Sequence, residues 1–263
     1  MDLGLSGKVA VVAGASRGLG KAVAFQLAAE GATLVLAARD QTTLEETASL
    51  IEKSFGNPVL PVVTDVTVEA EVNRLVELAT KNFNQVDILI ANAGGPPPSQ
   101  FETTDVSQWQ EGLQLNLLST IYLCRAFVPL MRQRAQGKIV AITSVSVKQP
   151  VDGLILSNTA RAGVVGMMKT LSNELAPNNV NVNVVCPGFT KTDRLVEIAS
   201  RMSEQEDVSI DSIYKRWTDQ IPMQRLGESS EFADVVAFLC SERASYVTGV
   251  CLQVDGGFVR SLL

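Results

Sequence analysis

Short runs of apolar, mostly β-branched residues recur along the chain, and longer segments with helical spacing separate them. The runs predict seven buried strands. They span Val9–Ala13, Thr33–Ala37, Val59–Val63, Asp87–Ala91, Lys138–Ile142, Val180–Cys186 and Val250–Val254. Between the third and fourth runs, Val72, Leu75 and Ala79 place one apolar stripe on a helix predicted over residues 67–82. Because strand and helix alternate, the pattern predicts an α/β fold, a parallel sheet with helices on both faces.

Polar residues mark the starts of two predicted helices, and two segments interrupt the alternation of strands and helices. Asp40 and Thr67 stand where helix N-caps are expected. The interruptions are residues 94–98, with the sequence GGPPP, and the polar stretch 187–226. Both follow carboxyl ends of predicted strands, the edge at which open α/β sheets bind ligands. We therefore expect both to form walls of a substrate site, with residues 187–226 as a lid segment.

Length and charge narrow the class of protein. The chain has 263 residues and a formal net charge of −6. Since α/β folds of about 250 residues often form one unit, we expect a single domain over residues 1–263. The negative net charge argues against a nucleic-acid partner, because a protein that binds nucleic acid needs a basic face.

Two features bear on cellular location. The longest stretch without a charged residue, Leu175–Thr190, is too short and too polar to span a bilayer. Asp2 stands where a secretory leader would carry positive charge. We therefore expect a cytoplasmic protein with no membrane partner.

Histidine is absent from the sequence, which limits the available acid–base chemistry. Ser/His/Asp triads, Cys/His dyads and imidazole metal sites are excluded. The four cysteines, Cys124, Cys186, Cys240 and Cys251, form no CxxC pair. We expect them to be buried structural thiols, and we expect no metal site. A catalytic proton must come from Tyr, Lys, Ser, Asp, Glu or water.

A glycine-rich turn follows the first predicted strand and opens an alanine-rich helix. Its sequence, GASRGLG, covers residues 14–20. Glycines at this place let the backbone approach a pyrophosphate, and the helix N-terminus supplies free N–H groups and a favourable dipole. The turn therefore predicts a dinucleotide site. Its candidate contacts are Gly14, Ser16, Arg17, Gly18, Leu19 and Gly20.

The residue after the second predicted strand indicates which dinucleotide is bound. NAD-preferring folds usually place a carboxylate there for the ribose hydroxyls, but this chain has Arg39. Arg17 can face the same place, so two guanidinium groups could grip a 2′-phosphate. Asp40 argues the other way, although a helix cap explains it as well. We therefore expect NADP(H) rather than NAD(H).

Further motifs, in order along the chain, resemble those of the short-chain dehydrogenase/reductase family over essentially the whole sequence. They are the GxxxGxG turn at Gly14, Gly18 and Gly20, Asp65–Val66, ANAG at residues 91–94, Asn116, Ser144, Pro187–Gly188 with Thr192, and DGG at residues 255–257. The resemblance implies a single-domain Rossmann-type, doubly wound fold. It also implies a homotetramer packed through helices near residues 112–135 and 157–176.

The same resemblance implies roles for individual residues. Asp65 would meet the adenine, Asn92 would line the ribose and nicotinamide region, and Thr192 would contact the carboxamide. The implied cofactor contacts also include Val66, Ala93, Gly94, Arg161, Pro187, Gly188 and Thr190.

The tyrosine and lysine that the family uses in catalysis are replaced. By resemblance, the family has a tyrosine thirteen residues after the serine at Ser144 and a lysine four residues later, and here these positions hold Ser157 and Arg161. A serine hydroxyl is a much weaker acid than a phenol with a pKa of about 10. Arginine is a fixed charge where lysine could join a proton relay. Losing a positioned general acid typically slows a reaction by ~10²–10⁴.

Other groups could supply the proton. Lys148, four residues after Ser144, and Tyr214, within residues 187–226, are candidates. Each also has a structural explanation, as a solvated loop lysine and as part of an amphipathic helix. Water anchored at Asn116 is a third source. We expect Tyr122 and Tyr246 to be structural.

The sequence thus favours an NADP(H)-dependent oxidoreductase that acts on a carbonyl or alcohol through Asn116, Ser144, Ser157 and Arg161. One alternative is a protein that binds NADP(H) without efficient hydride transfer. Another uses the pocket for elimination, hydration or isomerisation. The substrate is a small molecule of open identity. Apolar contacts are expected from Leu154, Ile155, Val196, Ile198 and Trp217.

Overall fold

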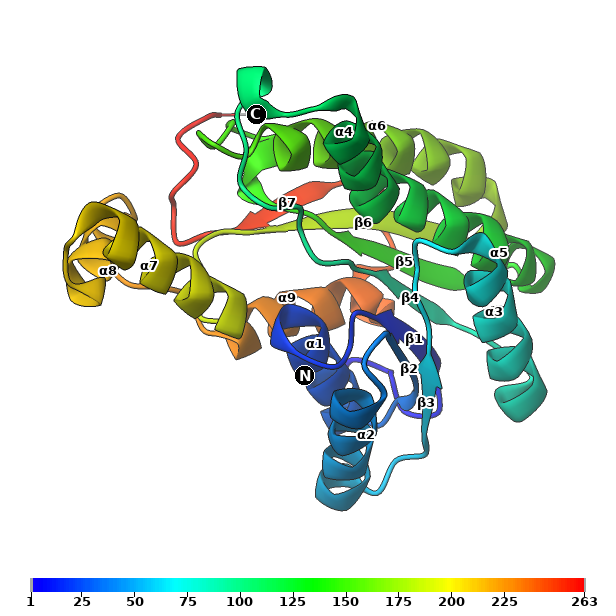
Figure 1. The fold of residues 1–263 in the computed structure, drawn as a ribbon. Helices are drawn as coiled ribbons and strands as arrows, with labels where there is room; N and C mark the ends of the chain where they lie inside the picture. Colours follow the sequence, from blue (N-terminus) through cyan, green and yellow to red (C-terminus); the bar gives the residue numbers. More distant parts are fainter. Residues whose placement is uncertain (1, 263) are drawn as a thin grey trace.

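A computed structural model describes residues 2–262 and contains one seven-stranded parallel sheet (Figure 1). Its strands are β1 (Val9–Ala13), β2 (Thr33–Ala38), β3 (Val59–Val63), β4 (Ile88–Ala91), β5 (Gly137–Ile142), β6 (Val180–Pro187) and β7 (Cys251–Val254). The strand order is β3-β2-β1-β4-β5-β6-β7. Val11 of β1 pairs with Val35 on one side and Leu89 on the other, so the order reverses beside β1. Ligands bind at this kind of reversal in open α/β sheets.

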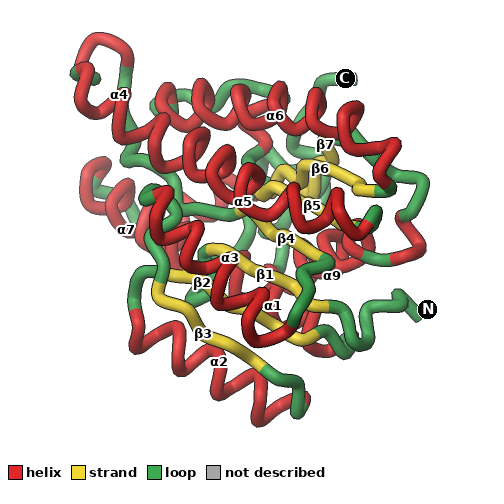
Figure 2. The backbone as a smooth tube through the Cα atoms, turned by 90° about the vertical axis from the view of Figure 1, so that its right-hand side faces the viewer, coloured by secondary structure: helices red, strands yellow, loops and turns green. Residues whose placement is uncertain are grey.

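Helices cover both faces of the sheet, which confirms the single-domain, doubly wound fold (Figures 1 and 2). They are α1 (Gly18–Ala29), α2 (Gln41–Phe55), α3 (Glu69–Phe83), α4 (Val106–Leu113), α5 (Ser119–Arg134), α6 (Ile155–Leu175), α7 (Asp193–Glu206), α8 (Ile210–Thr218) and α9 (Ser229–Cys240). Apolar side chains of α1, α2 and α9 form the core on one face. Those of α3, α5 and α6 form it on the other. The strand bounds agree with the predicted runs to within about one residue at each end.

One of the two predicted helix caps is confirmed and the other is wrong. The Asp40 carboxylate accepts hydrogen bonds from the Thr43 N–H (2.8 Å) and hydroxyl (2.7 Å), and it caps α2. Thr67 does not cap α3, because its N–H and hydroxyl both bond to Asp65 Oδ1 at 2.9 and 2.7 Å. This local turn at Asp65 delays the helix, so that α3 begins at Glu69.

A π-helical turn at Gln114–Leu118 joins α4 to α5, and the three form one continuous helix from Val106 to Arg134. By length and composition alone this helix could cross a membrane, although such helices also occur in the cores of proteins that meet no membrane. Its second half packs on the sheet through Leu123, Phe127 and Met131. The continuous helix therefore belongs to the layer of helices on that face.

Residues 187–226 form α7 and α8, which project away from the sheet (Figure 1). They enclose a separate small core that contains Ala199, Ile213, Trp217, Ile221 and Leu226. The ring of Phe189 stacks on Trp217 with 5.3 Å between centroids. Trp217 is therefore buried within this segment, which corrects its expected role as a substrate contact.

Candidate functional site

The glycine-rich turn after β1 is formed by close backbone contacts. Gly14 has a φ of +62°, a conformation that L side chains rarely adopt. A Cβ on Gly20 would lie 2.1 Å from Gly14 O, so no larger residue fits at that position. Asn92, just after β4, donates its amide N–H to Ala13 O at 3.2 Å and braces the same turn. The turn leads into α1, whose N-terminus has no side-chain cap among the described residues.

Two exposed arginines lie near the carboxyl ends of β1 and β2. Arg17 is the residue before α1, and Arg39 follows β2. Hydrogen bonds from the Thr43 N–H and hydroxyl lower the pKa of Asp40, and the positive charge of Arg17 lowers it further. Arg17 is thus close enough to the end of β2 to affect a charge there. Asp40 is bonded to Thr43, and neither arginine forms an ion pair within residues 2–262.

The remaining positions expected to contact a cofactor line the same edge of the sheet, and several have a structural partner. Asp65 Oδ1 accepts the two hydrogen bonds from Thr67 that are described above. Thr192 caps α7 by accepting a hydrogen bond from the Leu195 N–H at 3.4 Å. Thr190 donates to Gly188 O at 3.3 Å. A Cβ on Gly188 would lie 2.7 Å from the backbone of Asp255, so the loop after β6 packs directly on the DGG turn.

Gly94, at the start of the loop after β4, joins two of the expected catalytic residues. Its carbonyl oxygen accepts a hydrogen bond from Asn116 Nδ2 at 2.6 Å and one from Arg161 Nη2 at 3.3 Å. Asn116 lies in the π-helical turn and is 3% exposed. Its other amide atom, Oδ1, is buried without a hydrogen-bond partner among the described residues. An acceptor of this kind is suited to a water molecule or a ligand.

Arg161 is buried in α6 and forms a network of hydrogen bonds. Its Nη1 donates to Ile142 O (3.2 Å) and Thr143 O (3.0 Å), the carbonyl groups at the end of β5. Its Nε donates to Ser157 Oγ at 3.2 Å. No carboxylate pairs with Arg161 within residues 2–262. Burial, with a smaller effect of Arg194, lowers the pKa of Arg161 to about 10, which leaves it charged at neutral pH.

The two serine hydroxyls have similar bonding. Ser157 Oγ accepts from Arg161, and Ser144 Oγ accepts from the Ser146 N–H at 3.1 Å. In each hydroxyl group the oxygen accepts a hydrogen bond from the protein, and the hydroxyl hydrogen stays available to be donated to another acceptor. Helix α6 packs against the turn after Ser144, so the two serines belong to neighbouring elements. The structure thus connects Asn116, Ser157 and Arg161 directly and places Ser144 beside them.

Among the other candidate proton donors, Tyr214 lies away from these residues, whereas Lys148 ends the turn that begins at Ser144. Tyr214 packs against Trp217 with 5.8 Å between ring centroids, inside the core of residues 187–226. Tyr122 packs on the sheet core, as expected. Tyr246 is fully exposed, so its expected structural role is not supported. Lys148 is half-buried and close enough to Cys186 and Cys251 to favour their thiolates.

The cysteines differ from one another more than expected. Cys124 and Cys240 are buried, and burial raises the pKa of each thiol to about 12. Cys251, in contrast, is half-buried, which corrects the expectation that all four are buried. Its sulfur lies 3.4 Å from that of Cys186, and this hydrogen bond lowers the pKa of Cys251 to about 7.

One contact in this region was not predicted from the sequence. Arg194, in the first turn of α7, donates to Gly95 O (3.0 Å) and Pro96 O (3.1 Å). These carbonyl groups follow Gly94, which accepts from Asn116 and Arg161. The signal available in the sequence was a basic residue just inside a helix N-terminus, where the helix dipole disfavours a cation.

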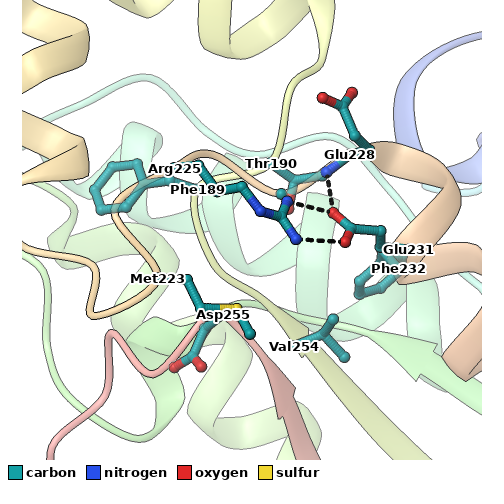
Figure 3. A pocket seen from close by; sticks show the side chains of 11 residues that line it. Phe189, Thr190, Met223, Arg225, Glu228, Glu231, Phe232, Val254 and Asp255 are labelled. Atoms are coloured by element: carbon teal, nitrogen blue, oxygen red, sulfur yellow. Dashed lines mark hydrogen bonds and ion pairs between the residues drawn. The ribbon is translucent and has the colours of Figure 1, made fainter.

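A small pocket of about 100 Å³ lies beside the loop after β6 (Figure 3). Arg225 points across it to Glu231 and forms a two-point ion pair with it. Thr190 is part of the lining, but Asn116, Ser144, Ser157 and Arg161 are not. The pocket is therefore separate from the residues expected to act on a substrate.

Comparisons with known proteins place the whole chain among reductases. Residues 14–259 match a family model described as enoyl-(acyl carrier protein) reductase. The chain is 35% identical over 257 residues to the 3-oxoacyl-[acyl-carrier-protein] reductase FabG of Aquifex aeolicus, covering 98% of this chain and 99% of that protein. It is 33% identical to dehydrogenase/reductase SDR family member 4 of Pongo abelii, covering 96% of this chain and 88% of that protein.

Solved structures give the same result. The L-sorbose reductase of Gluconobacter frateurii, crystallised with NADPH and L-sorbose, has a TM-score of 0.96 and 34% identity, and all of both chains is covered. The actinorhodin polyketide ketoreductase, crystallised with NADPH, has a TM-score of 0.93 and 30% identity, covering 97% of this chain and 98% of that one.

Proposed function

The chain belongs to the short-chain dehydrogenase/reductase family of oxidoreductases, and on this premise we propose that it transfers hydride between NADP(H) and a carbonyl or alcohol substrate. Asn116, Ser144, Ser157 and Arg161 take the places of the family's four catalytic residues. Residues 187–226 act as the lid. The working form is a cytoplasmic homotetramer.

The residues at the carboxyl edge of β1 and β2 fit NADP(H). The uncapped N-terminus of α1 offers N–H groups to a pyrophosphate. Arg17 and Arg39 are exposed cations beside the ribose position and suit a 2′-phosphate. Crystallised relatives hold NADPH, which supports the same choice. When bound, the nicotinamide supplies or accepts the hydride.

The hydrogen bond from Arg161 Nε to Ser157 Oγ is the observation that carries the proposal. It orients the serine so that its own hydrogen can be donated to the oxygen of a substrate carbonyl. A cationic donor also polarises the hydroxyl and stabilises negative charge that develops on the substrate oxygen. Ser144 supplies a second hydroxyl donor, since its lone pair is held by the Ser146 N–H.

Proton delivery is assigned to water held by Asn116. Its buried Oδ1 has no partner among residues 2–262, while its Nδ2 is fixed on Gly94 O. Arg161 Nη2 reaches the same carbonyl group. A water molecule that donates a hydrogen bond to Oδ1 would supply the proton for the substrate oxygen. This route replaces the proton relay that lysine supplies elsewhere in the family.

The bonding of Arg161 also favours a second candidate function, NADP(H) binding without efficient hydride transfer. Four of its five N–H groups are donated to protein oxygen atoms, which leaves little to offer a substrate or a ribose. In this case Arg161 mainly holds the ends of β4 and β5 together. Serine, as a weak acid, would then contribute little to catalysis.

NADPH consumption against a panel of ketones, aldehydes and keto sugars separates the two functions. The native protein is compared with the double variant S157Y/R161K and with S157A, after circular dichroism has shown that each is folded. We expect slow turnover by the native protein, less by S157A, and a gain of ~10²–10⁴ in the double variant. Turnover by the double variant alone would establish the binding function. Failure of the native protein to bind NADPH would overturn both.

A further inference from the structure

Arg194 joins the lid to the loop that carries Gly94, two segments about one hundred residues apart in the chain. Its Nη1 donates to Gly95 O at 3.0 Å and its Nη2 to Pro96 O at 3.1 Å. The planar guanidinium group is suited to this bridge because its two terminal nitrogens diverge in a fixed fork. A Cβ on Gly95 would lie 2.9 Å from Nη2, so the guanidinium group packs closely on this glycine.

The position of Arg194 in its helix is electrostatically costly. It lies in the first turn of α7, where the helix dipole favours anions. Arg194 is exposed as a whole, and partial burial of its side chain lowers its pKa, which Glu197 opposes and the neighbouring Arg17 and Arg201 reinforce. Packing of α7 on α8 leaves Arg194 outside the small core of the lid. The hydrogen bonds that Arg194 donates to Gly95 O and Pro96 O offset this electrostatic cost.

The loop that receives Arg194 is held on its other side by the catalytic candidates. Gly94 O accepts from Asn116 and Arg161, and the next two carbonyl groups accept from Arg194. Three consecutive carbonyl groups therefore connect the lid to α6 and to the π-helical turn. A shift of the lid would pull on the residue that Asn116 and Arg161 share.

The lid also passes close to the glycine-rich turn. A Cβ on Gly18 would lie 3.8 Å from the Thr192 side chain, two residues before Arg194. The start of α7 thus lies close both to the loop after β1 and to the loop after β4, on the two sides of the point where the strand order reverses. A link at this place holds these two loops together through α7.

We propose that Arg194 is a positioning residue that fixes the lid to the Gly94–Pro96 segment and so slows release of the bound cofactor. The second half of this statement rests on the proposed function, whereas the link itself does not. Arg194 sets the position of the lid through two hydrogen bonds and has no part in the chemical step.

Hydrogen–deuterium exchange of the cofactor-free protein tests the link. The variants are R194M, which removes both donors, R194K, which keeps the charge, and R74M, a control on the exposed face of α3, away from Arg194. We expect exchange about tenfold faster at the Ser99 N–H, which is bonded to Gly153 O, and in residues 193–206 of R194M, and a partial recovery in R194K. Exchange in β5 is expected to stay at the native rate, which excludes general unfolding. Equal exchange in R194M and R74M would overturn the link.

Stopped-flow fluorescence of bound NADPH then tests the consequence for the cofactor. We expect dissociation from R194M to be faster by about threefold or more, with an association rate close to native. Unchanged dissociation together with faster exchange would overturn the role in cofactor retention and leave a structural link. If native protein does not bind NADPH, the exchange result still decides the link, so the two failures are distinguishable.

Discussion

The two halves of the carboxyl edge of the sheet are constructed differently. The side after β1 and β2, which is the proposed nucleotide side, depends on backbone geometry, with Gly20 in contact with Gly14 O and Gly14 at positive φ. The side after β4, β5 and β6, which is the proposed catalytic side, depends on side chains that donate to carbonyl groups of distant elements. Asn116, Arg161 and Arg194 together hold residues 94–96 of the loop after β4.

This difference would let a family member change side chains on one side of this edge and keep its fold. A Cβ has no room at Gly20, so the turn after β1 keeps this glycine. On the other side, long side chains reach backbone carbonyl groups, as Arg161 does at Ile142 and Thr143. Such side chains can vary while the sheet beneath them is unchanged.

The largest expected effect is on the nucleotide side. Gly20→Ala places a Cβ 2.1 Å from Gly14 O, and neither backbone segment can move without distorting the turn. We expect NADPH affinity to fall by at least ~100-fold, because a displacement of about 1 Å in a binding turn is enough for such a loss. Fluorescence titration measures the dissociation constant.

The matched control is Gly166→Ala on α6, where a Cβ meets nothing within 4 Å. Its affinity is expected to equal that of the native protein. A Gly20→Ala protein that binds NADPH within twofold of native would show that the turn is adaptable, and the contrast between the two halves would disappear.

A smaller effect is expected from the cationic side chains at the same end. Arg39→Asp removes one of the two exposed cations and introduces a carboxylate. Since a hydrogen bond to a charged group contributes about 1.5–3 kcal/mol, the ratio of NADPH to NADH affinity should fall by about 10–100-fold. Isothermal titration with both nucleotides measures the ratio, and Arg74→Asp on the exposed face of α3 is the control. An unchanged ratio would show that Arg39 does not select the nucleotide.

The smallest effect concerns the ion pair between Arg225, at the end of the segment 187–226, and Glu231 of α9 (Figure 3). The Arg225 guanidinium and the Glu228 N–H lower the pKa of Glu231 to about 2. A lowered carboxyl pKa adds stability that is present above the ordinary value of 4.5 and is lost as pH falls towards 2. Glu231→Gln should therefore lower the melting temperature at pH 7 by no more than about 2 °C, and by less at pH 3. A difference that grows on acidification would contradict the assignment.

Prediction from the sequence was most successful where one residue type determines the conformation. Apolar runs identified all seven strands, and the glycines located the tight turn between β1 and α1, whose contact with a nucleotide stays a prediction. Thr67 was assigned wrongly because Asp65 competes for its hydroxyl and N–H over two residues, a local contact that helix signals do not reveal. Arg194 was missed because its partners are backbone carbonyl groups about one hundred residues away, and carbonyl groups leave no mark in a sequence. The half-buried state of Cys251 depends likewise on its place at the edge of the sheet, in β7.

The π-helical turn at Gln114–Leu118 has a consequence for how this protein can change in length. A π-helical turn closes i→i+5 hydrogen bonds where an α-helix closes i→i+4, so it holds one residue more than an α-helical turn. Deleting one residue here would leave an ordinary α-helical turn, with Gly112 still facing Leu156, which a Cβ on the glycine would meet at 3.3 Å, and with Leu123 and Phe127 still on the sheet. The same deletion elsewhere between Val106 and Arg134 would rotate one half of the long helix against the other by about 100°. A one-residue gap in alignments of relatives should therefore fall within these five residues.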